Sequence, residues 1–169
     1  EDFGPLAPAP LATSLTLRLE MECEKGAIEG APDLYTNGGL LQSWCHHPNH
    51  NEAVSYIEVT VERMERLFEG DNHNVKPGAM SNWFSRAIRA IGKSSLPDAP
   101  QRCEAILDRM THYPHYKCYE YVATILAWAN PNNPNLQDRA VNAKRILRRV
   151  AKPNTKCYTA VLRACLYDD

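Results

Sequence analysis

The chain has 169 residues, of which 44% are apolar and 23% are charged, and its formal net charge is −1. This composition allows a packed core and excludes a disordered chain. The near-zero charge argues against a uniformly cationic nucleic-acid binder, and the lack of an 18-residue apolar run excludes a predicted membrane span.

The charges are unevenly distributed along the chain. Residues 1–34 carry seven acids against two bases, whereas residues 139–163 carry eight bases and no acid. This asymmetry predicts an anionic partner near the C-terminal half. The six cysteines form no C-x-x-C pair, which favours buried single thiols in a reducing compartment over a disulfide framework.

The N-terminal segments differ in character. Residues 1–13 are rich in Pro and Ala and predict an extended tail, without a secretory apolar region or an Arg-rich transit segment. Residues 14–30 begin with an alternating apolar pattern, Leu15 to Cys23, which is typical of a strand. The abundance of Leu, Arg, Glu and Met favours a helix instead, so we expect residues 14–30 to form a helix of an incomplete leading repeat, with a strand as the alternative.

From residue 31 onward the sequence repeats two kinds of helical segment. The first kind aligns on Ser43, Ala90, Ala127 and Ala164, at spacings of 47, 37 and 37 residues. The second kind ends in an arginine followed by an apolar residue, at Arg63, Arg109 and Arg149. The predicted helices are 33–45, 52–69, 80–92, 98–111, 116–129, 137–150 and 154–167. They form three and a half units, about 31–76, 77–114, 115–151 and 152–169, which predicts an all-α solenoid of stacked helix-turn-helix repeats.

These segments resemble the pentatricopeptide repeat. "APDLYTNGGLLQSWCHH" and "KPNTKCYTAVLRAC" are similar to the first helix of that repeat, and "DAPQRCEAILDRM" is similar to its second helix. The resemblance covers residues 31–169. It implies a right-handed superhelix in the mitochondrial matrix or plastid stroma that binds single-stranded RNA, one base per repeat.

The resemblance also implies base-reading positions on the first helices and at the starts of the repeats. In the third repeat the starting position is either His115 or Lys117. Gly38 and Gly78 lack a polar side chain that could hydrogen-bond to a base edge. The full set of implied RNA-binding residues is Asp33, Gly38, Gly78, Ser85, Lys117, Val122, Asn154 and Thr159.

Basic residues near the C-terminus are the second candidate site. They would contact phosphates or an acidic partner, whereas the alternative is a solvated face that keeps the array soluble. Arg145, Arg148 and Arg149 are expected on the outer helix, and Lys156 and Arg163 on the following inner helix. The full set is Lys144, Arg145, Arg148, Arg149, Lys152, Lys156 and Arg163.

A cluster of metal-ligand residue types, "WCHHPNHNEA", contains Cys45, His46, His47 and His50. Adjacent residues at a helix end diverge, and a second cluster at matching spacing is missing, so we interpret this stretch as a helix end and a turn, without a metal. No G-x-S-x-G, P-loop or H-E-x-x-H motif occurs, so we expect no catalysis, no cofactor and no small-molecule substrate.

The function expected from the sequence is therefore non-catalytic binding of single-stranded RNA, in RNA processing, stability or translation. The alternative is a scaffold subunit of a large organellar complex such as a mitochondrial ribosome, which docks through protein contacts.

Overall fold

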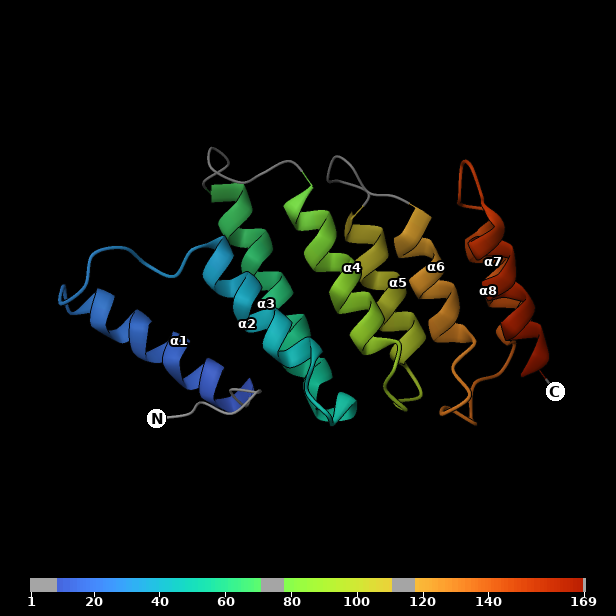
Figure 1. Ribbon diagram of the computed structural model, residues 1–169, viewed down its shortest axis with the longest axis horizontal. Coiled ribbons are helices and arrows are strands. Elements are labelled where there is room, and N and C mark those ends of the chain that lie inside the picture. The colour runs from blue at the N-terminus through green and yellow to red at the C-terminus, as the bar shows by residue number, and fades with distance from the viewer. Residues whose placement is uncertain (1–8, 71–77, 111–117, 169) are drawn as a thin grey trace.

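Apolar residues at helical spacing produce an all-helical chain in the computed structural model, which describes residues 9–70, 78–110 and 118–168 (Figure 1). No strand occurs among these residues. The prediction of an all-α fold is confirmed, and the seven predicted helices begin and end within three residues of those observed. The described residues form eight helices: α1 (Ala9–Glu24), α2 (Leu34–Cys45), α3 (His50–Gly70), α4 (Ala79–Ile91), α5 (Ala99–Met110), α6 (Cys118–Trp128), α7 (Arg139–Leu147) and α8 (Thr155–Leu166).

Helix α1 resolves the alternatives for the N-terminal segment. Residues 14–24 are helical, so the alternating apolar pattern does not form a strand. Residues 9–13, predicted as part of an extended tail, belong to the same helix, and that part of the prediction is wrong. Pro10 lies in the first turn, where its missing N–H costs nothing. The Trp44 indole donates a hydrogen bond of 3.0 Å to the Thr13 hydroxyl, which attaches α1 to α2.

The helices form two rows. We call α2, α4, α6 and α8 the A row, and α3, α5 and α7 the B row. Each A-row helix packs against its neighbours in both rows, whereas no two B-row helices approach each other closely within the described residues. Helix α1 packs against α2 at one end of the array, and α7 and α8 lie at the other end (Figure 1). The A row is therefore the more closely packed of the two.

Glycine allows the close approach of neighbouring A-row helices. A Cβ atom on Gly38 of α2 would lie 2.6 Å from the Trp83 ring of α4, a distance that real Cβ atoms do not reach. A Cβ atom on Gly92, at the end of α4, would lie 3.0 Å from that of Ala127 on α6. Both glycines therefore have a packing role.

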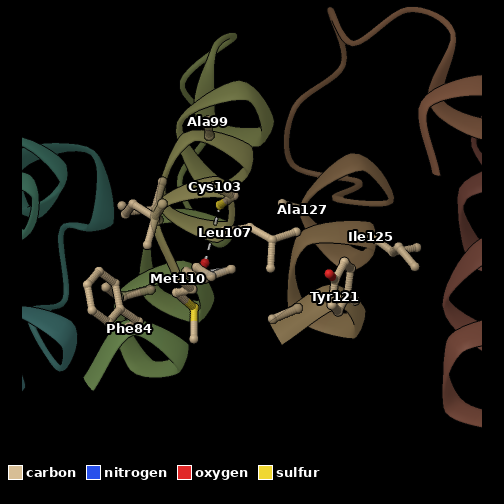
Figure 2. Packing of buried hydrophobic residues seen from close by; sticks show 14 of the residues in the cluster. Phe84, Ala99, Cys103, Leu107, Met110, Tyr121, Ile125 and Ala127 are labelled. Carbon is tan, nitrogen blue, oxygen red and sulfur yellow. Dashed lines mark hydrogen bonds between the residues drawn. The ribbon is translucent and has the colours of Figure 1, made fainter. Parts of the chain in front are cut away.

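The core lies between the two rows. Figure 2 shows the side chains of Leu107 and Met110 on α5 among those of Phe84 on α4 and Tyr121 on α6. The Cys103 thiol is fully buried and lies 3.3 Å from the carbonyl oxygen of Ile88, to which it donates a hydrogen bond. Burial raises the pKa of this thiol, so it is protonated and acts as a small apolar side chain.

A network of hydrogen bonds fixes the start of α7. The Asp168 carboxylate accepts hydrogen bonds from the backbone N–H groups of Arg139 and Ala140, at 2.8 and 3.0 Å. The buried Arg139 guanidinium donates to the carbonyl oxygens of Asn130, at 2.8 Å, and of Leu136, at 3.2 Å. One member of the C-terminal basic stretch is thus a structural residue of the turn between α6 and α7.

Candidate nucleic-acid interface

Two arginines of the predicted phosphate-contact set form ion pairs with α5. Arg145 donates to the Glu104 carboxylate at 2.7 Å, and Arg149 donates to the Asp108 carboxylate. The Arg149 guanidinium also lies over the Tyr121 ring, 5.9 Å from its centroid. Both arginines therefore link neighbouring B-row helices, and the N–H groups that bond to these acids are not available to a phosphate.

The same kind of ion pair recurs along the whole array. Each pair joins an arginine of the B segments to an acid about one repeat earlier in the sequence, on the preceding B-row helix or, for Arg63, on α1. Because B-row backbones do not touch, these long side chains bridge the space between them. The pairs are Arg63 with Glu20, Arg102 with Glu58 at 2.6 Å, Arg109 with Glu65 at 3.3 Å, Arg145 with Glu104, and Arg149 with Asp108.

The other predicted phosphate contacts are more exposed. Lys144, Arg148 and Lys152 are exposed and lie at α7 and just beyond it. Lys156 on α8 is exposed, and its ammonium group lies 5.2 Å from the centroid of the Tyr119 ring. Arg163 is also on α8, on a different part of the surface from the α7 residues. The structure thus divides this predicted set between two surfaces.

A cavity of about 360 Å³ on the A-row side is lined by three cations that form no ion pair with the described residues. Arg89 comes from α4, Lys93 from the turn after it, and Arg163 from α8, while Leu126 of α6 contributes to the apolar part of the wall. Within the described residues no carboxylate lies among the lining residues or within ion-pair distance of these three cations. The Arg89 Nε donates to the carbonyl oxygen of Ser85 at 3.2 Å. Its other two guanidinium nitrogens form no hydrogen bond with the described residues.

This group of three, the A-row cations, is defined as Arg89, Lys93 and Arg163. Sequence reasoning nominated only Arg163. The missed signal is the repeat register, since Arg89 and Arg163 are 74 residues apart, which is twice the 37-residue spacing of the A helices. Leu126 occupies the corresponding position between them. Arginines at matching positions of alternate repeats are expected on one surface of a repeat array.

The base-reading positions on the A row divide into packed and exposed residues. Ser85 is buried and donates its hydroxyl hydrogen to the Glu120 carboxylate at 2.5 Å. Gly38 lies against Trp83, and Val122 is half-buried against the core. Thr159 is exposed, and its hydroxyl donates to the carbonyl oxygen one turn earlier, at 2.9 Å.

The implied base-reading residues at the starts of the repeats lie directly before helices, where they are described. The Asp33 carboxylate accepts hydrogen bonds from the backbone N–H and the hydroxyl of Thr36, at 2.7 and 2.8 Å, and the same bonds lower its pKa below the usual value. The Asn154 side chain caps α8 in the same way, and Gly78 precedes α4 with a φ of 84°. Lys117, like the alternative His115, lies outside the described residues.

The cysteine–histidine stretch forms the end of α2 and the turn that follows. The His46 Nδ1 lies 2.7 Å from the carbonyl oxygen of Gln42, and the His47 ring packs on Trp44 with centroids 5.2 Å apart. Burial raises the pKa of the Cys45 thiol to about 12, and burial with the charge of Lys93 lowers that of His50. Among the described residues, no three His, Cys, Asp or Glu side chains converge on a point that would suit a metal ion.

Comparison of the chain with protein-family models, with curated proteins and with solved structures gives no match in any of the three. Within the part of the chain that the structure describes, each helix is too short or too polar to cross a membrane.

Proposed function

We propose that this protein is a non-catalytic pentatricopeptide-like repeat protein that binds single-stranded RNA in a mitochondrial matrix or plastid stroma. Its role would be in RNA processing, stability or translation. The resemblance of the repeats supports the family and the organelle. The regular alternation of two helix rows supports the finer description of the fold as a right-handed α-solenoid.

The distribution of paired and unpaired cations carries the RNA proposal. Arg102 and Arg145 of the B-row helices form ion pairs with acids, whereas the A-row cations line a cavity without any acid among its described lining residues. An unneutralised group of cations attracts phosphates, since each contact releases counterions from the nucleic acid. The A row is also the surface on which the pentatricopeptide resemblance places RNA.

This binding would position an RNA strand without reading its sequence. Phosphate contacts fix register and orientation, while base identity is read by polar side chains at base edges. Ser85 and Asn154 bond to protein groups, and Gly38 has no side chain to offer. We therefore expect weak discrimination among RNA sequences of equal length.

Fluorescence anisotropy of labelled single-stranded RNA, titrated with the full chain at several salt concentrations, tests the proposal. Three phosphate contacts predict that log K falls with log salt at a slope of about −2, using about 0.7 per contact for single strands. Oligonucleotides of uniform U and uniform A should bind within a few-fold of each other. Absence of binding at 50 mM salt, to either sequence, would contradict the proposal.

The second candidate function is a scaffold subunit of a large organellar complex. It is favoured by large apolar side chains that are exposed on both rows of the array, such as Val59 of α3 and Tyr119 of α6. Exposed apolar side chains of this size are typical of surfaces that contact other proteins. A chain that binds no RNA and co-sediments with organellar ribosomal particles would support this function.

A further inference from the structure

The A-row cations gather at one cavity and do not form a continuous line of charge along the row. Gln42 of α2, Arg89 of α4, Leu126 of α6 and Arg163 of α8 occupy the same register position, at the 47- and 37-residue spacings of the A helices. Lys93 adds a third cation from the turn after α4. A site for a passing strand would be expected to place a cation on every repeat at this register. The charge is instead concentrated between α4, α6 and α8.

The cavity lies where two A-row helices end. Helices α4 and α6 end at the same edge of the array (Figure 1), and the turns after them line the cavity with Gly92, Lys93 and residues 130–132. The Asn130 side-chain amide donates to the carbonyl oxygens of Gly92 and Ser94, at 3.0 and 2.9 Å. These backbone acceptors are bonded within the turns, so they do not compete with a ligand for the cations.

The charge of the cavity matches the end of an RNA strand better than its interior. A terminal phosphomonoester carries a charge of about −1.5 to −2 at pH 7 and has three acceptor oxygens. Together with the neighbouring phosphodiester, a phosphorylated terminal nucleotide presents about −2.5 to −3, which three cations can neutralise. An internal nucleotide lies between two phosphodiesters and presents only about −2.

The side chains around the cavity also suit a terminal nucleotide. Arg89 keeps two guanidinium nitrogens that form no hydrogen bond with the described residues, and Arg163 forms no ion pair with them. A planar guanidinium group can donate to two phosphate oxygens at once, whereas Lys93 supplies a point charge. Leu126 and Ala127 belong to the apolar part of the wall, against which the sugar or the base can pack.

We propose that this cavity binds the phosphorylated end of a single-stranded RNA, with the terminal phosphomonoester between Arg89, Lys93 and Arg163. The inference rests on the proposed function, and it names the part of the RNA that the A-row cations recognise. Recognition of a phosphorylated end positions a strand without reading its bases, which agrees with the weak sequence discrimination expected of this chain.

Competition anisotropy with the full chain tests the inference. Unlabelled uniform-U oligonucleotides displace a labelled uniform-U strand with hydroxyl ends, and they end in a 5′-phosphate, in a 3′-phosphate or in hydroxyl groups only. The hydroxyl-ended competitor is one nucleotide longer than the other two, so all three carry the same number of phosphates. We expect a phosphorylated competitor to bind at least about 5-fold more tightly than the hydroxyl-ended one.

Two single substitutions in the full chain separate the cavity from the overall charge. Arg163→Gln removes one of the three cations and should reduce the preference for the phosphorylated end to less than about 2-fold. Arg66→Gln is the matched control, because Arg66 is exposed on α3 of the B row and its Nε donates to the carbonyl oxygen of Glu62. This control removes the same charge and should keep the full preference.

Equal displacement by all three competitors, while the labelled strand binds, would overturn this inference and leave the proposed function standing. A preference that persists in Arg163→Gln would also overturn it. Absence of binding by the labelled strand would overturn both the inference and the proposed function. Uridine 5′-monophosphate at the same concentrations should not displace the strand. If it displaced the strand as well as the phosphorylated oligonucleotide does, the cavity would be a site for a free nucleotide and not for an RNA end.

Discussion

Arg145 of α7 donates to Glu104 of α5 over 2.7 Å, and this contact joins two B-row helices whose backbones do not touch. Glu104 also accepts a hydrogen bond from the Trp128 indole at 2.8 Å, so one carboxylate connects α5 to both α6 and α7. An arginine that the sequence nominates for phosphate contact is thus part of the structure of the array.

The Arg145→Ala/Arg149→Ala variant should therefore lose stability and keep its RNA affinity. Partly exposed ion pairs contribute about 0.2–1 kcal/mol each, so we expect the free energy of unfolding to fall by about 0.5–2 kcal/mol. Urea denaturation at low salt measures this loss, which should shrink at 1 M salt because screening weakens the pairs. A large loss of RNA affinity in this variant would show that the arginines act as phosphate contacts after all.

Gly38→Ala should destabilise the chain, because the added methyl group would collide with the Trp83 ring. We expect a loss of about 1–3 kcal/mol, as for other overpacked sites. The matched control is Gly39→Ala in the same helix, where nothing lies within 4 Å of the new methyl group. That change should stabilise the helix by about 0.5–1 kcal/mol, because alanine is the better helix former. Similar effects of the two substitutions in thermal denaturation would contradict the packing role of Gly38.

Ser85→Ala and Thr159→Ala compare two implied base-reading positions of opposite structural character. Ser85 hydrogen-bonds to the buried Glu120 carboxylate, whereas Thr159 is exposed and its hydroxyl donates to Thr155 of its own helix. Removing a partner of a buried charged group costs about 1–3 kcal/mol, so Ser85→Ala should destabilise while Thr159→Ala changes stability by less than about 0.5 kcal/mol. If chemical denaturation shows no cost for Ser85→Ala, Glu120 must be satisfied without that hydroxyl.

Asp33→Ala should remove the N-terminal cap of α2 and cost about 1 kcal/mol at pH 7. Hydrogen bonds from Thr36 lower the pKa of this carboxyl in the folded chain, so its contribution is present above the unfolded value of 3.8. That contribution is lost as pH falls through the lower folded value. Stability measured between pH 2 and 7 should therefore show the two chains converging in acid, whereas Asp33→Asn should keep part of the cap at all pH values.

The sequence predicts the helices well because their signals are local. Apolar spacing and turn residues such as "NPNNPN" mark where helices begin and end, and the repeat register adds a check on each one. The strand-like alternation from Leu15 to Cys23 was ambiguous because the deciding contact, between Thr13 and Trp44, joins residues 31 positions apart. Propensity alone cannot supply such a contact.

The candidate site was less predictable, for a related reason. A run of bases indicates an anionic partner, but the sequence does not show which bases already face acids of the neighbouring repeat. Arg145 and Arg149 form ion pairs with α5 acids 41 residues earlier. Arg89 and Lys93 are isolated bases in the sequence, and the fold places them at the same cavity as Arg163. Pairing across repeats has to be seen in three dimensions.

Two charge-reversal variants with equal change in net charge test RNA binding by the A row most directly. One is Arg89→Glu/Lys93→Glu/Arg163→Glu, and the other is Lys144→Glu/Arg148→Glu/Lys152→Glu, on and just beyond α7. Anisotropy with a uniform-U oligonucleotide at 50 mM salt compares both with the unchanged chain. We predict that the first variant loses at least about 100-fold in affinity and the second less than about 3-fold. Equal losses in the two variants would show that RNA responds only to net charge, and a larger loss in the second would place RNA outside the A row.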